Sequence, residues 1–217
     1  MTKNAKDDIL FFSRLRLKIT YCVPAEHLYY KRGDSNVECK ELSLKGLLLI
    51  TPDVFKDDRG FFFESYSLFE YGDFGIMHDF VQDNHSRSVK DTIRGLHFQA
   101  SPGQAKLIRV LSGTIFDVAV DIRPESSACG TWEGVELSAE NFRQIYIPAG
   151  FAHGFAVLSD TAEVEYKCSV PYDPGKERTI AWDDPDIGID WPVAEPVLSE
   201  RDRRGIPLSK YLKDGLP

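Results

Sequence analysis

Residues 93–106, IRGLHFQASPGQAK, carry the clearest signal for the fold and for a site within it. Residues 93–99 alternate side chains between two faces as a β-strand does, and the glycine and proline that follow predict a turn. The strand places His97 among apolar residues, and Lys106 comes just after the turn. Because imidazole titrates near neutral pH, this stretch is a candidate for proton chemistry inside a mostly β protein.

Short β-rich runs with turn signals between them continue along the chain, which is typical of a sandwich or small barrel. The dipeptide Ser112-Gly113 predicts the clearest hairpin in the sequence. Ser67 is expected to cap a short helix over residues 68–71, and a further helix is expected around residues 208–213. The predicted strands cover residues 47–50, 61–66, 81–86, 93–99, 107–111, 114–122, 132–137, 144–147, 154–158, 164–169 and 179–182.

Composition excludes several classes of protein. The chain has 217 residues and a net charge of -8, whereas a nucleic-acid-binding protein needs a basic stripe. Its four cysteines form no C-x-x-C pair, which favours reduced thiols over a zinc or redox motif. No apolar run approaches the roughly 20 residues of a membrane helix. These features predict a cytoplasmic protein without a membrane or nucleic-acid partner.

Residues 1–35 differ from the remainder of the chain. They carry seven lysines or arginines but only four acidic residues, so this segment is net positive. The net charge of residues 36–217 is therefore more negative than that of the full chain. Residues 15–23 alternate like a half-exposed strand. We therefore divide the chain into an N-terminal extension of unknown role, residues 1–35, and a single domain, residues 36–217.

Residues 148–153, PAGFAH, have the P-x-G-x-x-H form found in cupin barrels, where a tight turn precedes an inward histidine. Cupins usually bind a metal through this histidine, an H-x-H pair and a glutamate, since a divalent ion needs three or four convergent ligands. Here His97 is followed by Phe98 and Gln99, so the second histidine of that pair is missing. The sequence therefore predicts no metal site.

Three residues suit proton transfer next to a carbonyl group. Neutral His97 can remove a proton from carbon, and Lys106 can stabilise the enolate oxygen that forms. Tyr166 alternates with Glu165 and Lys167, so it is expected to face the interior, where its phenol can return a proton. The structural alternative is a hydrogen-bonded core histidine, a packed tyrosine and a solvated lysine.

Other residues suit an anionic ligand. Arg59 and Arg94 could clamp a phosphate, although a surface arginine is the simpler interpretation of Arg59. Strict alternation puts Arg94 and His97 on opposite faces of their strand, and a bulge at Gly95 would bring them together. Phe62 and Glu64 are expected on one face of their strand, and Gln82 and Asn84 on one face of theirs. These side chains could stack on a ligand and form hydrogen bonds with it.

Seven motifs together point to one family. They are DDRGFFFESY (57–66), FVQDNHSRS (80–88), IRGLHFQ (93–99), FDVAVDIR (116–123), IPAGFAHGF (147–155), EYKC (165–168) and DDPDIGIDWP (183–192). With these motifs, the chain from about residue 36 onward resembles the dTDP-4-dehydrorhamnose 3,5-epimerase family, the RmlC-like cupins. The resemblance implies an all-β jelly-roll barrel with a few short helices, no metal or other cofactor, and a homodimer whose subunits share N-terminal strands.

The resemblance also implies roles for individual residues. His97 matches the base, Asp202 the carboxylate that orients it, Tyr166 the proton donor, and Lys106 the group near the developing enolate. The positions that match the nucleotide-sugar site are Arg59, Phe62, Glu64, Gln82, Asn84, Arg94, His153 and Tyr172.

The leading hypothesis is an epimerase that inverts C3 and C5 of dTDP-4-dehydro-6-deoxy-D-glucose to give dTDP-4-dehydro-L-rhamnose. A related enzyme that inverts only C3 or C5, or uses another nucleotide's sugar, is an alternative within the same fold. A non-catalytic cupin that binds a sugar nucleotide is another. A metal-dependent cupin oxygenase or isomerase is a further alternative, against which the missing second histidine argues.

Overall fold

The structure is a computed structural model that describes residues 36–214. The N-terminal extension and the alternating pattern of residues 15–23 lie outside the described residues. None of the helices within residues 36–214 has the length and apolar character needed to cross a membrane.

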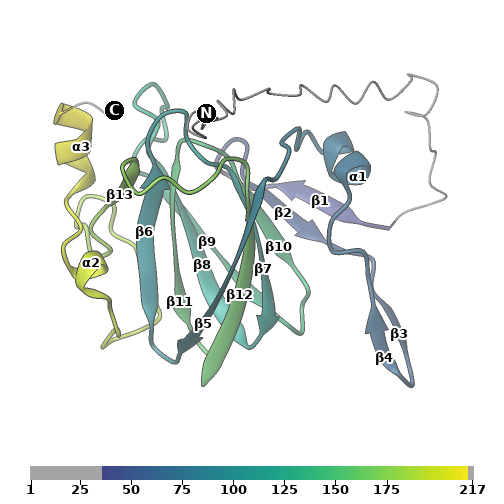
Figure 1. The fold of residues 1–217 in the computed structure, drawn as a ribbon. Helices are drawn as coiled ribbons and strands as arrows, with labels where there is room; N and C mark the ends of the chain where they lie inside the picture. The colour runs from purple at the N-terminus through teal and green to yellow at the C-terminus, as the bar shows by residue number, and fades with distance from the viewer. Residues whose placement is uncertain (1–35, 215–217) are drawn as a thin grey trace, which may run out of the picture. The chain divides into compact units, whose positions relative to one another are not determined.

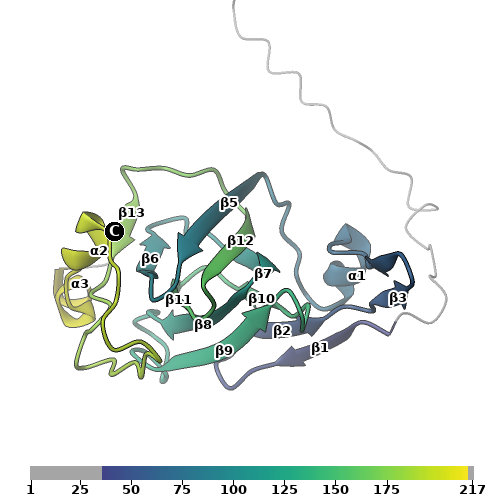
Figure 2. The same ribbon diagram turned by 90° about the horizontal axis from the view of Figure 1, so that it is seen from below.

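Two antiparallel sheets form the body of the domain (Figure 1). In order, the six-stranded sheet contains β1 (Glu38–Glu41), β2 (Leu48–Thr51), β10 (Gln144–Ile147), β7 (Lys106–Ser112), β12 (Thr161–Cys168) and β5 (Gln82–Val89). The five-stranded sheet contains β13 (Glu177–Thr179), β6 (Ile93–Gln99), β11 (Phe151–Val157), β8 (Thr114–Asp121) and β9 (Trp132–Ser138). Figure 2 shows the sheets as two facing layers. No strand of the described residues belongs to both, so the expected barrel is a two-sheet jelly roll rather than a closed barrel.

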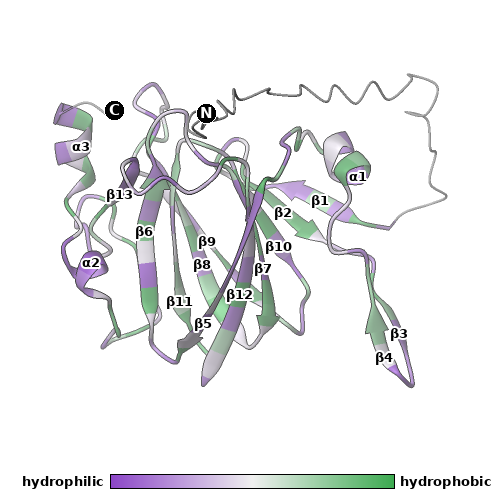
Figure 3. Ribbon diagram, viewed as in Figure 1, coloured by the Kyte–Doolittle hydropathy of each residue, from purple (hydrophilic) through white to green (hydrophobic). Residues whose placement is uncertain are grey.

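The core lies between the facing sheets. Ile108, Ile145 and Val164 of the six-stranded sheet pack in one cluster with Ile115 and Phe155 of the five-stranded sheet. Strand β11 is buried along its whole length, as expected of a central strand. In Figure 3, strands β6 and β12 carry both hydrophobic and hydrophilic residues along their length. Strands β6 and β12 are therefore held in place by the core and also present polar side chains.

The predicted hairpin at Ser112-Gly113 is wrong. Strand β7 pairs with β10 and β12, whereas β8 pairs with β9 and β11 in the other sheet. Gly113 has a φ of +78°, and a Cβ there would lie 2.1 Å from the carbonyl oxygen of Thr161. The tight turn is thus a corner between sheets, because turn residues report a change of direction and not the partner of the next strand.

Most predicted strands are present, with differences toward both ends of the domain. Strands β1 and β3 (Phe55–Asp57) were not predicted, because neither presents an alternating apolar face. The strand expected over residues 61–66 is only β4 (Gly60–Phe62), which pairs with β3 in a separate hairpin. The strand expected at residues 179–182 begins and ends earlier, as β13.

Three short helices flank the sheets. The helix expected at residues 68–71 is α1 (Leu68–Asp73), but the side chain of Ser67 makes no capping hydrogen bond, so that predicted role is wrong. Helix α2 (Glu200–Arg203) was not predicted, whereas α3 (Leu208–Asp214) was. Both C-terminal helices lie beside β6 and β13 (Figure 2).

Contacts with the five-stranded sheet anchor the C-terminal segment. The backbone N–H of Leu208 donates to the buried carboxylate of Asp184 at 2.7 Å. The ring of Tyr211 packs edge-on against Phe98 of β6, and its hydroxyl donates to the carbonyl of Thr179. Helix α2, which precedes α3, contacts β6, the strand that carries His97.

Candidate active site

A β-bulge in β6 aims two polar side chains into one cavity. Along the pairing of β6 with β11, His97 lies opposite His153 and Arg94 lies opposite Phe155. The step is three residues on β6 and two on β11, so β6 holds one extra residue. Gly95 occupies the bulge with a φ of +137°. Arg94 and His97 consequently face the same side, which strict alternation does not allow and a bulge at Gly95 was expected to permit.

The cavity lies between the two sheets, against β6 and β11 on one side and β5, β7 and β12 on the other. Its walls are formed by Ser86, Arg94, His97, Lys106, His153, Phe155, Tyr166, Ser199, Arg201 and Asp202. An adjoining cavity shares several of these residues and adds Gln82, Asn84, Gln104, Tyr172 and Glu177. Nine of the predicted site residues therefore meet around one space, and Arg59, Phe62 and Glu64 are not among them.

His97 and Asp202 form a buried pair although 105 positions separate them. Nε2 of His97 lies 2.5 Å from Oδ1 of Asp202, and the two side chains are 16% and 3% exposed. The pair places the ring proton on Nε2, which leaves Nδ1 as the acceptor. Burial would raise the pKa of Asp202, but hydrogen bonds from His97 and Ser199 hold it below its ordinary value. Asp202 is thus an ionised partner that orients the imidazole.

The environment of His97 keeps the imidazole neutral. Burial is the main cause that lowers the pKa of His97, and the charges of Arg201 and Lys106 act in the same direction. Asp202 opposes them without overcoming them. A neutral buried imidazole that is held by a carboxylate has the properties of a general base.

Arg201 lies close to both ring nitrogens of His97 and was not identified from the sequence. Its Nη2 is 3.0 Å from Nε2 and 3.4 Å from Nδ1 of His97, and its Nη1 is 2.6 Å from Oε2 of Glu177 on β13. The side chain is half exposed and borders both cavities. No pattern marks Arg201 in the sequence, since α2 is a single turn without hydrophobic periodicity.

Lys106 and Tyr166 face His97 from the opposite sheet. Nζ of Lys106 lies 5.9 Å from the centre of the Tyr166 ring. Burial lowers the pKa of Lys106 and raises that of Tyr166. Tyr166 points inward as predicted, while Glu165 and Lys167 form ion pairs on the outer face of β12. The phenol therefore stays protonated at neutral pH and borders the same cavity as the imidazole.

A second histidine and aspartate pair includes His153, which lines the cavity. Nε2 of His153 lies 2.9 Å from Oδ2 of Asp117, and both residues are buried. Asp117 lies within the motif FDVAVDIR (116–123) but was given no role, because nothing in the sequence indicates that it pairs with His153. The histidine of the P-x-G-x-x-H motif is thus held by a carboxylate. Within residues 36–214, no group of three or more His, Cys, Asp or Glu side chains is arranged to hold a metal ion.

Polar side chains fix an aromatic ring at the edge of the adjoining cavity. Gln82 donates to Asn84 through Nε2 and accepts the backbone N–H of Tyr172 through Oε1 at 2.8 Å. The hydroxyl of Tyr172 donates to Glu177 at 2.8 Å, and the residue is 51% exposed. An exposed ring held at both ends is suited to stacking on a planar ligand.

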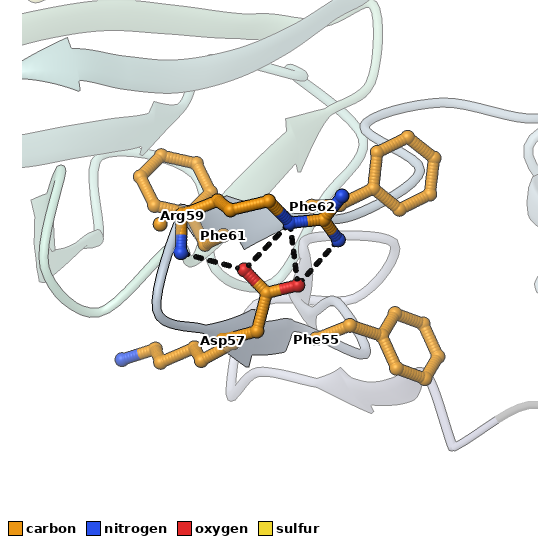
Figure 4. Close-up of a pocket in the computed structure, with 7 residues that line it drawn as sticks. Phe55, Asp57, Arg59, Phe61 and Phe62 are labelled. Atoms are coloured by element: carbon orange, nitrogen blue, oxygen red, sulfur yellow. Dashed lines mark hydrogen bonds and ion pairs between the residues drawn. The ribbon is translucent and has the colours of Figure 1, made fainter.

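The β3–β4 hairpin carries the predicted residues that do not reach the cavity. Arg59 is 89% exposed and pairs with Asp57, and the rings of Phe55 and Phe62 project to one side of the hairpin (Figure 4). Glu64 follows the hairpin directly. The hairpin lies at the opposite side of the domain from β6 (Figure 1), so Arg59 and Arg94 form no phosphate clamp within one chain.

The comparisons with known proteins all point to one family. The family profile described as dTDP-4-dehydrorhamnose 3,5-epimerase matches residues 41–210. The dTDP-4-dehydrorhamnose 3,5-epimerase of Pseudomonas aeruginosa is 51% identical over 171 residues, which is 78% of this chain and 94% of that protein.

Solved structures agree with this family. The dTDP-6-deoxy-D-glucose-3,5-epimerase RmlC of Legionella pneumophila, in complex with dTDP-4-keto-L-rhamnose, is 46% identical with a TM-score of 0.80. The alignment covers 83% of this chain and 97% of that one. ChmJ, a 3'-monoepimerase of Streptomyces bikiniensis in complex with dTDP-quinovose, is 36% identical with a TM-score of 0.76, over 81% and 90% of the two chains.

Proposed function

The chain belongs to the dTDP-4-dehydrorhamnose 3,5-epimerase family, and on that premise we propose that it inverts C3 and C5 of dTDP-4-dehydro-6-deoxy-D-glucose. The product is dTDP-4-dehydro-L-rhamnose. One observation carries the proposal: the His97–Asp202 pair, Lys106 and Tyr166 surround one cavity between the sheets. The C4 ketone acidifies the hydrogens at C3 and C5, so a base and an acid placed about the ring can invert either carbon.

His97 is the proposed base. Its Nδ1 removes the proton from the carbon beside the ketone, and the electron pair of the broken C–H bond moves into an enolate. The imidazolium that forms is stabilised by the hydrogen bond from Nε2 to Asp202, which is 2.5 Å long. Since burial keeps the resting imidazole neutral, the base is ready at neutral pH.

Lys106 and Tyr166 are the proposed partners of the enolate. The amino group of Lys106, buried on β7, donates to the oxygen on which negative charge develops. Tyr166 returns a proton to carbon from the opposite side of the ring. Its raised pKa supports this role because a protonated phenol can donate, whereas a phenolate cannot.

The remaining cavity residues are proposed to bind the nucleotide sugar. Arg94 supplies positive charge for the diphosphate, and His153, held by Asp117, donates to the sugar. Gln82 and Asn84 line the adjoining cavity, and the exposed ring of Tyr172 is placed to stack on the base of the nucleotide.

We propose a homodimer in which the β3–β4 hairpin supplies Arg59, Phe62 and the nearby Glu64 to the second subunit. Phe62 is 72% exposed and Phe55 is 61% exposed, although a small protein rarely leaves adjacent aromatic rings in water. Their common direction in Figure 4, beside the guanidinium of Arg59, suits insertion against a nucleotide and its phosphates. The subunit interface would then complete a site that one chain leaves open.

The proposed setting is the cytoplasm. All three cysteines within the described residues, Cys39, Cys129 and Cys168, are free thiols, as expected in a reducing compartment.

Product stereochemistry tests the proposed reaction. The purified protein is incubated with dTDP-4-dehydro-6-deoxy-D-glucose, the ketone is reduced chemically to trap the products, and the sugars are identified by NMR. Inversion at both C3 and C5 is expected. Inversion at C3 alone would show that the protein is a 3'-monoepimerase. Recovery of unchanged sugar would contradict the proposed catalysis and favour a protein that only binds the sugar nucleotide.

A further inference from the structure

The residue that begins helix α2 makes two hydrogen bonds to Asp202. Oγ of Ser199 accepts the backbone N–H of Asp202 at 3.1 Å, as an N-cap residue does. The same hydroxyl donates its proton to Oδ2 of Asp202 at 2.7 Å. Because an N-cap hydroxyl needs only to accept, the second bond is additional to capping.

The second bond completes the environment of the carboxylate. Oδ1 of Asp202 bonds to His97, and Oδ2 bonds to Ser199. Arg201 is the nearest charged alternative, but its Nε lies 3.9 Å from Oδ1, which is beyond hydrogen-bond distance. Within residues 36–214, Ser199 is therefore the side chain that holds Oδ2, and Asp202 itself is only 3% exposed.

A carboxylate held at both oxygens has one orientation. If Ser199 lost its hydroxyl, Oδ2 would be left buried with no donor, and the carboxylate could rotate to seek another one, such as the guanidinium of Arg201. Rotation would change the direction and length of the bond from Oδ1 to Nε2 of His97. The aim of Nδ1 into the cavity would change with it.

We propose that Ser199 is a positioning residue for the reaction, which fixes the carboxylate of Asp202 and, through it, the orientation and tautomer of His97. This proposal rests on the proposed function of His97 as the base. It assigns to Ser199 no contact with the substrate.

Three substitutions separate this role from simple capping. Ser199→Ala removes both bonds. Ser199→Gly removes the hydroxyl while it preserves the helix start to within a few tenths of a kcal/mol, because glycine is tolerated at the N-cap. Ser199→Thr keeps a hydroxyl that can accept and donate.

Steady-state kinetics on dTDP-4-dehydro-6-deoxy-D-glucose provide the first readout. Ser199→Ala and Ser199→Gly should each lower kcat about tenfold with KM within about twofold, as expected for a lost charge-assisted hydrogen bond, and Ser199→Thr should restore activity. If Ser199→Gly were fully active while Ser199→Ala lost activity, Ser199 would act only as a helix cap, and the proposal would be overturned. Full activity of both would overturn it as well.

An NMR readout does not depend on turnover. In protein labelled with 15N-histidine, the Nε2 proton of His97 should resonate far downfield in the wild type and in Ser199→Thr, and should shift upfield or exchange away in Ser199→Gly. An unchanged resonance in Ser199→Gly would overturn the positioning role. If the wild type failed to convert the sugar, the proposed function would fail by itself, and this spectrum would still decide the role of Ser199.

Discussion

The inter-sheet cavity and the β3–β4 hairpin both carry charged and aromatic side chains, but they hold them in opposite ways. In the cavity, the hydrogen-bonded pair of His97 and Asp202 is buried and each partner has further contacts. On the hairpin, the ion pair of Arg59 and Asp57 is exposed and entirely local. The cavity is thus organised within one chain, whereas the hairpin presents exposed side chains that we propose to contact a second subunit.

Removing one acidic partner in each region should give the largest difference. Asp202→Asn removes the negative charge beside His97, the proposed base, so kcat should fall by about a hundredfold or more. Asp57→Asn removes a solvent-exposed partner and should leave kcat within about twofold. Steady-state kinetics at neutral pH measure both. Equal losses would contradict the contrast between the two regions.

Two glycines with positive φ offer the next comparison. A Cβ at Gly95 would lie 2.5 Å from Cα of Gly154, whereas a Cβ at Gly60 of the hairpin meets nothing within 4 Å. Gly95→Ala should lower the free energy of unfolding by more than about 2 kcal/mol, and Gly60→Ala by about 1 kcal/mol, since only backbone strain acts there. Urea unfolding checks this order, and a milder effect at Gly95 would argue against the tight bulge.

An exposed hairpin ring should matter for assembly. Phe62→Ser should weaken the dimer and raise KM by roughly tenfold each, because buried aromatic rings dominate interfaces. Val89→Ser is the matched control, since Val89 is 57% exposed on β5, away from the hairpin. Analytical ultracentrifugation and kinetics measure the two effects. A wild-type protein that is monomeric and fully active when dilute would refute the shared site.

The smallest expected effect is a shift in the pH profile. Activity should rise with pH as His97 loses its proton, with a half-point below about 6.5, because burial, Arg201 and Lys106 all disfavour the imidazolium. Asp202 acts in the opposite direction, so Asp202→Asn should move the half-point lower still. The half-point is measured from a profile of kcat/KM against pH. A half-point above the ordinary histidine value would show that the carboxylate outweighs burial.

The sequence predicted strand β6, which carries the proposed base, well because its signals are local. Strand β6 has the expected bounds, and a bulge at Gly95 was named as the condition that would bring Arg94 and His97 to one face. The inward direction of Tyr166 followed from simple alternation. In each case, neighbouring residues contain the information.

Features that depend on distant packing could not be predicted in this way. The turn at Gly113 looked like a hairpin, yet the following strand joins the other sheet, since strand partners are chosen by the whole core. Asp202 was identified only through resemblance to a family. Ser199 and Arg201 were missed because they reach the cavity through the docking of α2. Asp117 was missed because its buried partner, His153, lies on another strand, β11.

Solvent isotope exchange tests the central claim most directly, namely that the His97 cavity removes protons beside the C4 ketone. The protein is incubated in heavy water with dTDP-4-dehydro-6-deoxy-D-glucose, and deuterium in the sugar is located by NMR and mass spectrometry. Deuterium should enter at both C3 and C5 with the wild type, and His97→Ala should reduce the rate by about a thousandfold. Incorporation by the wild type no faster than by His97→Ala would contradict the account.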